Sequence, residues 1–421
     1  MARDEDWANR RIPFNKPSFV GRELEYIAQT VANGQTSGNG PFTKRCQQFF
    51  EETYGYTKCL LTTSCTDALE MAAILADIHP GDEVIMPSYT FVSTALAFVR
   101  QGATIIFADS GARHPNIDAD TIEALITPRT KAIVAVHYAG VACDMRRILS
   151  LARRHNLLMI GDAAQAIDSY YRDDLSDVAY PWHKRLIKRA NQYPLGGIGH
   201  FGCFSFHETK NIQCGEGGML TINDPGYVRR AEIIWEKGTN RSEFFRGEVS
   251  KYEWVDIGSS FLPSAITAAF LWAQLEQLTK IQRKRKTLWR LYEEGLRPVA
   301  DSGCAELPQI PSYATNNAHM FYLVCASQAE RARLMTHLQA DGIQSATHYQ
   351  SLHNSAYYRD KYKALPLVNC ERYVHCLLRL PLFYELEPTQ VERVIASVNA
   401  FYGVGGASVR GKKRGRAIGK D

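Results

Sequence analysis

Short apolar runs alternate with helical patterns up to residue 222, and this alternation constrains the fold more than any other feature of the chain. Helical patterns occupy 66–78 and 144–156, the second with Asp144 as its expected N-cap. The alternation predicts an α/β fold with a mostly parallel sheet covered on both faces, and such sheets bind ligands at the carboxyl ends of their strands. The runs have the length of strands and span residues 58–63, 82–87, 104–109, 131–138, 156–162, 200–206 and 217–222.

A smaller α/β pattern follows a long helical one. Apolar residues recur at helical spacing from about residue 263 to about residue 296, and a helix of this length commonly joins two domains. Thr389 and Glu392 have the spacing of a capping box at the start of the last helix. Beyond the long helix we expect strands at 319–325 and 378–383 and helices at 329–343 and 389–403.

These patterns divide the chain into three parts. We expect a large domain over 12–262, a linking helix with a small C-terminal domain over 263–403, and a basic tail over 404–421. The net charge of +5 lies in that tail, because 405–421 contains six Lys or Arg residues against Asp421. The tail has no apolar pattern, so we expect it to be disordered and solvated; contact with nucleic acid or an anionic surface is the alternative.

Composition excludes several other classes of protein. The neutral body argues against nucleic acid as the main partner. No apolar run is long enough to span a membrane, and the start MARDEDWANRR lacks the apolar stretch of a secretory signal. The ten cysteines include no C-x-x-C pair, which argues against zinc and against a disulfide framework. We therefore expect a cytoplasmic protein with no metal site.

The stretch FGCFSFHETKN, residues 201–211, ends an apolar run with a lysine. Lysines are seldom buried unless they are paired. In one interpretation Lys210 is an ordinary lysine at a strand end whose ammonium group reaches water. In the other, its amine binds a cofactor aldehyde covalently. Pyridoxal phosphate would also need a carboxylate for its ring nitrogen, a helix N-terminus for its phosphate and an apolar wall for its ring.

Residues that could bind the ring nitrogen, the ring hydroxyl group and the ring face follow other predicted strands. Asp162 ends a buried strand, where a carboxylate needs a cationic partner, and a pyridinium N–H would serve; an N-cap or a buried ion pair is an equally good explanation. Gln165 lies one helical turn further and could reach the ring hydroxyl group. Phe91 follows another strand and is a candidate for the ring wall, although an aromatic residue there is more often part of the core.

A helix start supplies a candidate phosphate site. Ser64 and Asp67 have capping-box spacing, so a helix should begin near Cys65 with free N–H groups. Thr66 adds a hydroxyl group, and Ser205, five residues before the lysine, adds another. A capped helix without a ligand is the more common meaning of this pattern.

Several long strings resemble one known family. They are EVIMPSYTFVST, VHYAGVACDM, GCFSFHETKN, EKGTNRSEFFRG and DIGSS, and the similarity extends from Ile12 to Tyr384. They resemble the DegT/DnrJ/EryC1/StrS family of sugar-nucleotide aminotransferases. This resemblance implies the type I fold of aspartate aminotransferase, pyridoxal 5′-phosphate as cofactor and a homodimer with active sites at its interface. The strings are most similar to those of members that aminate C4 of dTDP-4-keto-6-deoxyglucose with L-glutamate; amination at C3 or of another nucleotide sugar is the alternative.

The resemblance also implies roles for individual residues. Lys210 would bind the cofactor covalently and then move protons. Asp162 would bind the ring nitrogen, and Gln165 would bind the ring oxygen. Cys65, Thr66 and Ser205 would bind the phosphate, and Phe91 would stack on the ring. His348 would contact the active site of the neighbouring subunit. Related dehydratases have histidine in place of the lysine, so Lys210 argues against that class. A non-catalytic relative would not need this set of groups.

Two features depart from the family's pattern. Many members have an N-x-x-D sequence before the long helix, whose asparagine reaches the partner subunit's phosphate. Here Leu262 cannot form that hydrogen bond, and Ala265 replaces the acid. The chain also carries about twenty extra residues near 173–194. Their basic side chains could meet a diphosphate, or the insertion could be a solvated surface loop.

Overall fold

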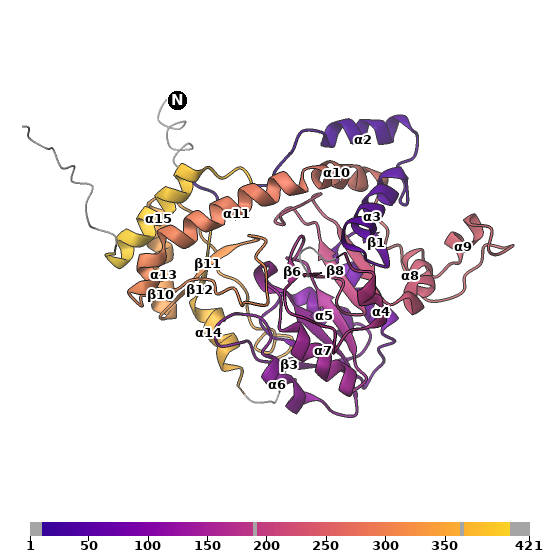
Figure 1. The fold of residues 1–421 in the computed structure, drawn as a ribbon, viewed down its shortest axis with the longest axis horizontal. Coiled ribbons are helices and arrows are strands. Elements are labelled where there is room, and N and C mark those ends of the chain that lie inside the picture. Colours follow the sequence, from indigo (N-terminus) through magenta and orange to yellow (C-terminus); the bar gives the residue numbers. More distant parts are fainter. Residues whose placement is uncertain (1–10, 188–191, 363–365, 405–421) are drawn as a thin grey trace, which may run out of the picture.

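The computed structural model describes residues 11–187, 192–362 and 366–404. The expectation of a disordered tail falls almost wholly on 405–421, outside these residues. Two sheets of different size make up the body of the molecule, with helices packed around them (Figure 1).

The larger sheet has seven strands in the order β1-β9-β8-β5-β4-β2-β3. β9 is antiparallel to both of its neighbours, while the other adjacent pairs are parallel. All seven predicted strands form, and the predicted, mostly parallel α/β sheet is confirmed. The strands are β1 Lys58–Thr62, β2 Glu83–Pro87, β3 Thr104–Ala108, β4 Thr130–Val136, β5 Leu158–Asp162, β8 Phe201–Ser205 and β9 Gly218–Ile222.

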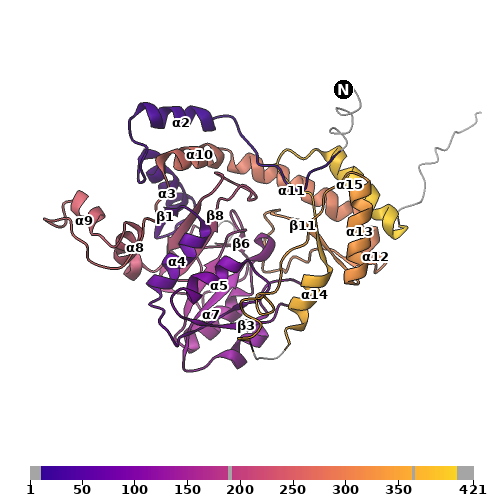
Figure 2. The same cartoon turned by 180° about the vertical axis from the view of Figure 1, so that it is seen from behind.

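Helices between the strands bury apolar faces against the sheet. In α7 the side chain of Asp144 accepts a hydrogen bond from the backbone N–H of Arg147, as its expected N-cap role requires. Met145, Ile148, Leu149 and Ala152 of this helix are buried. Figure 2 shows α4 beside α5, and these helices pack together. The helices of this part are α3 Pro41–Tyr54, α4 Cys65–Leu75, α5 Val92–Val99, α6 Ala119–Ile122, α7 Met145–Arg154, α8 Val228–Trp235 and α9 Arg241–Phe245.

The long helical pattern forms two helices rather than the single helix that we predicted. α10 (Ala265–Glu276) packs against α2 (Glu23–Ala32), and α11 (Leu278–Gly295) continues toward the smaller sheet (Figure 1). Gln277, with φ −104° and ψ 5°, leaves the helical region between them. Apolar periodicity runs through this break, so the sequence pattern could not reveal it.

The smaller sheet is antiparallel and contains β10 (Ala305–Glu306), β11 (Phe321–Cys325) and β12 (Leu377–Leu380). A second hydrophobic cluster surrounds it, separate from the cluster of the large sheet. Ile12 belongs to this second cluster and pairs with Ile343. Its helices are α12 Arg297–Asp301, α13 Gln328–Ala340, α14 Val368–Cys376 and α15 Pro388–Tyr402.

The capping box of α15 differs from the predicted one. Glu387 is the N-cap, and its partner is Gln390, whereas Thr389 and Glu392 were predicted. Pro388 takes the first helical position, which suits a residue without an N–H donor, and this moves the helix start.

The insertion packs against the large sheet on the side away from the strands' carboxyl ends. Leu175 and Trp182 are buried, and His183 Nε2 lies 2.7 Å from the carbonyl oxygen of Ile198, shortly before β8 begins. None of the described insertion residues lines the cavity described below. Of the two alternatives, a solvated surface loop does not hold for Leu175 and Trp182, which are buried, and the described insertion residues lie away from the cavity where a diphosphate contact would be made. The fold also contains a short pair of strands, β6 (Tyr170–Tyr171) and β7 (Tyr193–Pro194). Short 3₁₀ turns span Glu123–Leu125, Tyr138–Gly140, Pro181–Lys184 and Pro225–Tyr227.

All ten cysteines are free thiols. Within the described ranges, every helix is too short or too polar to cross a bilayer.

Candidate active site

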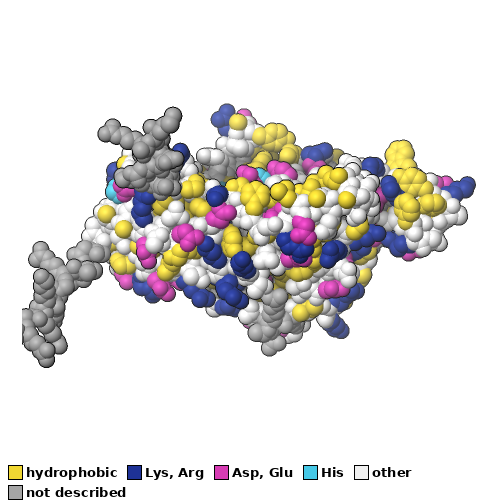
Figure 3. Space-filling model, turned by 90° about the horizontal axis from the view of Figure 1, so that it is seen from above, with side chains coloured by type: hydrophobic (Ala, Val, Ile, Leu, Met, Phe, Trp, Pro, Cys, Tyr) yellow, Lys and Arg dark blue, Asp and Glu magenta, His cyan; other side chains and the backbone are white. Residues whose placement is uncertain are grey.

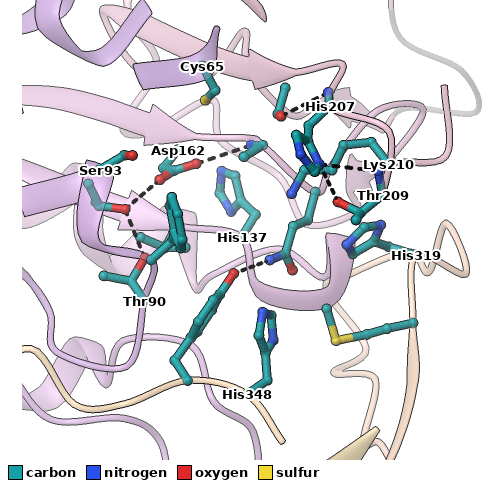
Figure 4. A pocket seen from close by; sticks show the side chains of 18 of the residues that line it. Cys65, Thr90, Ser93, His137, Asp162, His207, Thr209, Lys210, His319 and His348 are labelled. Atoms are coloured by element: carbon teal, nitrogen blue, oxygen red, sulfur yellow. Dashed lines mark hydrogen bonds between the residues drawn. The ribbon is translucent and has the colours of Figure 1, made fainter. Parts of the chain in front are cut away.

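A cavity of about 630 Å³ opens at the carboxyl ends of the strands. Asp162 ends β5 and Ser205 ends β8, and both strands run in the same direction. β1 also runs this way, because β9 is antiparallel to both β1 and β8. The structure therefore brings all eight predicted residues to one cavity, whose lining includes Cys65, Thr66, Phe91, Asp162, Gln165, Ser205, Lys210 and His348. Figure 4 labels Cys65, Asp162, Lys210 and His348 among them.

Lys210 lies in a turn that buried hydrogen bonds hold in place. Its N–H donates to the carbonyl of His207 at 2.9 Å. The next residue, Asn211, is buried, and its Nδ2 donates to Gln282 Oε1 at 2.8 Å and to the carbonyl of Asn317 at 2.9 Å. These bonds join the turn to α11 and to the chain before β11, so the position of the lysine is fixed from both parts of the fold.

The side chain of Lys210 is partly buried within the cavity (Figure 4). Loss of hydration lowers the pKa of its amine, and the negative charge of Asp162 partly opposes this shift. A lower pKa increases the neutral fraction, which is the form that attacks a carbonyl. The partly buried position of Lys210 in the cavity thus argues against the first interpretation, in which its ammonium group reaches bulk water.

Asp162 is a buried carboxylate, 5% exposed, that is held by neutral donors. Thr94 Oγ1 donates to Oδ2 at 2.8 Å, and the N–H of Ala164 donates to Oδ1 at 3.1 Å. Burial raises the pKa of Asp162, and these two donors oppose the shift. No described residue forms an ion pair with it, and no helix begins there, so neither alternative explanation of this aspartate holds within the described chain.

The start of α4 forms one wall of the cavity. Ser64 Oγ accepts a hydrogen bond from the N–H of Asp67 at 3.1 Å, as predicted. The reciprocal half of the box is absent, because the carboxylate of Asp67 accepts the hydroxyl of Thr63 instead. The first N–H groups of the helix have no intrahelical partner. Thr66 Oγ1 lies 2.7 Å from Ser93 Oγ, so hydroxyl groups stand beside those N–H groups.

Gly218 allows β9 to approach this helix start closely. A Cβ atom there would lie 2.3 Å from the carbonyl carbon of Ser64 and 2.5 Å from the nitrogen of Cys65. Because both neighbours are backbone atoms, Gly218→Ala must displace the start of α4. We expect a loss of about 1–3 kcal/mol in the free energy of unfolding and cofactor affinity at least about tenfold weaker. Urea unfolding and absorbance titration with the cofactor would measure these.

Gly226→Ala is the matched control, since its new Cβ would meet only the side chain of Asp224. Equal cofactor affinity in Gly218→Ala and the parent would contradict this account of the helix start.

Gln165 and His348 are held by other residues of the cavity. Gln165 Oε1 accepts the N–H of Ala139 at 2.6 Å, and its Nε2 donates to the hydroxyl of Tyr349 at 2.9 Å. His348 Nδ1 lies 3.1 Å from the hydroxyl of Tyr138. His348 thus lines the cavity of its own chain, whereas the resemblance implied a contact with the neighbour's site.

The sequence analysis missed other lining residues. His137 follows β4 at the same sheet edge, and burial lowers its pKa to about 4, so its ring is neutral. Thr94 supports Asp162 from α5. The strand-end argument that found Asp162 would also have found His137. No comparable signal marks His319 or Arg379, which the smaller sheet's region contributes to the cavity.

Two segments lie elsewhere. Leu262 lines a second cavity of about 870 Å³, and its side chain packs beside Gly38. Arg241 and Ser242 of the string EKGTNRSEFFRG line that cavity as well, away from the lysine. β9, which precedes this string, runs antiparallel and ends beside the start of β1, at the opposite edge of the sheet.

Residues 18–399 match the DegT/DnrJ/EryC1/StrS aminotransferase family. The chain belongs to this family. Among solved structures, the aminotransferase TlmJ from Streptoalloteichus hindustanus is 27% identical, with a TM-score of 0.81 over 93% of this chain and 99% of that one. DesV from S. venezuelae is 28% identical, with a TM-score of 0.80 over 93% and 98% of the two chains. The predicted type I fold is confirmed.

A putative sugar aminotransferase from Streptococcus pneumoniae, Spr1654, has the same fold in its PLP form, at 22% identity and a TM-score of 0.80 over 93% of this chain and 99% of that one. Pyridoxal 5′-phosphate is the cofactor of this aminotransferase family, as predicted. The cavity fits it: a buried carboxylate that forms no ion pair with a described residue, a partly buried lysine and a helix N-terminus lie around one space.

Proposed function

We propose that this aminotransferase moves the amino group of L-glutamate to C4 of dTDP-4-keto-6-deoxyglucose, giving 2-oxoglutarate and dTDP-4-amino-4,6-dideoxygalactose. One observation carries the aminotransfer: Lys210 shares its cavity with Asp162, a buried carboxylate that lacks a cation among the described residues. The choice of sugar rests on the long strings shared with C4 transaminases. An aminotransferase acting on a 3-keto or another nucleotide sugar is the alternative.

Each group in the cavity has a separate task in this proposal. Pyridoxal phosphate, when bound, supplies an aldehyde that takes up the amino group and a ring that withdraws electrons from the reacting carbon. Lys210 Nζ holds the cofactor covalently and afterwards removes and returns the proton of the donor's α-carbon. Its lowered pKa favours the neutral amine that accepts this proton. Asp162 keeps a proton on the ring nitrogen through a charge-assisted hydrogen bond.

The remaining predicted residues orient the cofactor. The N–H groups of Cys65 and Thr66 bind the phosphate at the start of α4, together with the hydroxyl of Ser205. Gln165 directs its second N–H toward the ring oxygen. Phe91, 57% exposed in this chain, would lie against the ring face of the bound cofactor.

We also propose a homodimer with active sites at its interface. Large apolar side chains are exposed on α5, next to the cavity, and on the projection that begins with α9. Phe245 is 71% exposed and Trp254 81% exposed on this projection, and Figure 3 shows hydrophobic side chains gathered at its end. A second copy would cover these surfaces. Leu262 cannot supply the hydrogen bond that an asparagine makes across the interface in many relatives, so the phosphate must be held without it.

A substrate panel tests the sugar assignment. We expect the purified holoprotein to form 2-oxoglutarate from L-glutamate with the 4-keto dTDP sugar at least about tenfold faster than with the 3-keto isomer. The two isomers differ only in the position of a carbonyl, and pocket shape alone gives modest discrimination. Product NMR would locate the new amine. Faster turnover of the 3-keto sugar, or of a sugar on another nucleotide, would contradict the assignment but leave the aminotransfer in place.

A further inference from the structure

Three side chains with metal-binding atoms meet at the edge of the large sheet, outside the cavity of Lys210. They are His353, Cys370 and Glu371, and one ligand atom from each lies within 4.8 Å of the other two. Cys370 and Glu371 belong to α14, whereas His353 follows the segment that carries His348 into the cavity. None of the three lines that cavity, so they have no task in the proposed aminotransfer.

Residues at the carboxyl ends of β2 and β3 fix two of these side chains. Ser88 Oγ, directly after β2, accepts the backbone N–H of His353 at 3.1 Å and lies 2.7 Å from its Nδ1. Asp109 Oδ1, directly after β3, accepts the backbone N–H of Cys370 at 2.8 Å. Because β2 and β3 are parallel, both anchors lie at one edge of the sheet. His353 and Cys370 are buried there, so the cluster is a built part of the fold.

The imidazole of His353 is oriented as a metal ligand requires. Ser88 Oγ can accept the proton of Nδ1, which leaves a lone pair on Nε2. Histidines that bind metals are almost always held by a hydrogen bond from the other ring nitrogen in this way. Nε2 faces the carboxylate of Glu371, and Asn354 Nδ2 donates to the same carboxylate at 2.9 Å. Both the histidine and the glutamate thus have partners that orient them.

The separations between these atoms suit a tetrahedral zinc ion. Zinc lies about 2.0–2.2 Å from nitrogen and oxygen ligands and about 2.3 Å from sulfur, so two tetrahedral ligands stand about 3.3–3.6 Å apart. His353 Nε2 and Glu371 Oε1 already have this separation, at 3.4 Å. Cys370 Sγ lies within 4.8 Å of both, so a movement of at most about 1 Å completes the set.

We propose that His353, Cys370 and Glu371 bind a zinc ion, with water as the fourth ligand. Thiolate and imidazole ligands select zinc over magnesium and calcium, which prefer oxygen ligands. When zinc binds, the S–H bond of Cys370 breaks, a Zn–S bond forms and the proton passes to water. The thiolate and the carboxylate together balance the two positive charges of the ion. The sequence analysis expected no metal site because the cysteines form no C-x-x-C pair, but this site needs only one cysteine.

The ion would join segments that lie far apart in the chain. His353 closely follows His348 and Tyr349, which line the cavity of the lysine, and α14 packs on the smaller sheet. Bound zinc would fasten both segments to the ends of β2 and β3. Its role is therefore structural: it stabilises one wall of the cavity without touching the cofactor, and it does not depend on the proposed sugar or amino donor.

Zinc binding to the full-length holoprotein tests the proposal. Protein without an affinity tag is treated with a chelator, and zinc is then added in competition with a chromophoric indicator. We expect one zinc ion per chain and a higher thermal midpoint with zinc than after chelation, because a ligand that binds only the folded state stabilises it. A stoichiometry well below one ion per chain, or an unchanged thermal midpoint, would overturn the proposal.

Variants locate the bound ion. Cys370→Ser is expected to weaken zinc binding at least about a hundredfold, because it removes a ligand. Ser88→Ala keeps all three ligands and should weaken binding about tenfold, because His353 loses the partner that orients its ring. Cys376→Ser is the matched control, since Cys376 is also a buried thiol of α14 but is not part of the cluster. Equal zinc affinity in the two cysteine variants would overturn the assignment.

Cobalt(II) keeps the test decisive even if Cys370→Ser does not fold. Cobalt takes the place of zinc in the parent holoprotein, and the difference spectrum against the zinc-loaded protein removes the absorbance of the cofactor. We expect the intense visible bands of a tetrahedral site together with a sulfur-to-cobalt charge-transfer band. Weak octahedral bands without the sulfur band would place the ion on surface oxygen and nitrogen ligands and overturn the proposal. None of these measurements uses aminotransfer, so failure of the proposed function would leave their result unaffected.

Discussion

Lys210→Ala is expected to abolish turnover and the absorbance band of the lysine-bound cofactor together. Among the lysines, Lys210 alone lines the described cavity, so no other ammonium group there can replace its covalent bond or its proton transfer. Loss of the proton-transfer group alone is worth about 10²–10⁴-fold in rate. Visible spectra of the purified variant and the formation of 2-oxoglutarate from glutamate would measure the two effects.

Lys280→Ala is a suitable control, because Lys280 is exposed on α11 and lies outside the cavity. It should keep both the absorbance band and the rate. Turnover by Lys210→Ala at the rate of the parent would refute the whole assignment of this cavity, whichever sugar is the substrate.

Asp162→Asn is expected to lower turnover by about 10²–10³-fold while cofactor-free protein becomes more stable. The activity falls because a neutral amide does not hold a proton on the ring nitrogen, and the ring withdraws electrons less well. The opposite effect on stability follows from burial, which raises the pKa of Asp162 in the folded protein above its ordinary value of 3.8. Steady-state rates of the holoprotein and urea unfolding of the cofactor-free protein would measure the two effects.

The pH dependence gives the sign of the stability effect. A carboxyl group with a raised folded pKa binds more protons in the folded state than in the unfolded state, so stability falls as the pH rises from 3.8 through the raised value. Asp162→Asn should remove this decline and gain about 1–3 kcal/mol at neutral pH in the cofactor-free protein. Asp177→Asn, at an exposed ion pair with Arg146, should change neither the rate nor this slope. A variant of Asp162 with parental rates would show that the aspartate is only structural.

The strands and the strand-end residues could be predicted because burial acts directly on the sequence. Strands covered on both faces must be apolar along their whole length, so each of the seven appears as a continuous run. A polar residue after such a run lies at a sheet edge, and Asp162 and Lys210 were found in this way. His137, which follows β4, lies at the same edge by the same rule.

The elements that were predicted wrongly depend on local geometry that apolar spacing does not record. The break at Gln277 lies within an uninterrupted apolar pattern. Pro388 takes the first helical position of α15, so the N-cap is Glu387 and not Thr389. The polar residues of the insertion suggest a surface loop, whereas its Leu175 and Trp182 are buried.

The sequence by itself determined the kind of sheet, the lysine and the acidic residue that line the cavity, and the helix that begins beside them. Each of these follows from short-range pattern, because a few neighbouring residues decide whether a segment is buried and where it ends. Only the tertiary structure decided which residues of the smaller sheet's region complete the cavity lining. Arg379 and His319 reach the cavity because α11 carries the smaller sheet across to the larger one, and no local pattern encodes the contact between two segments so far apart in the chain.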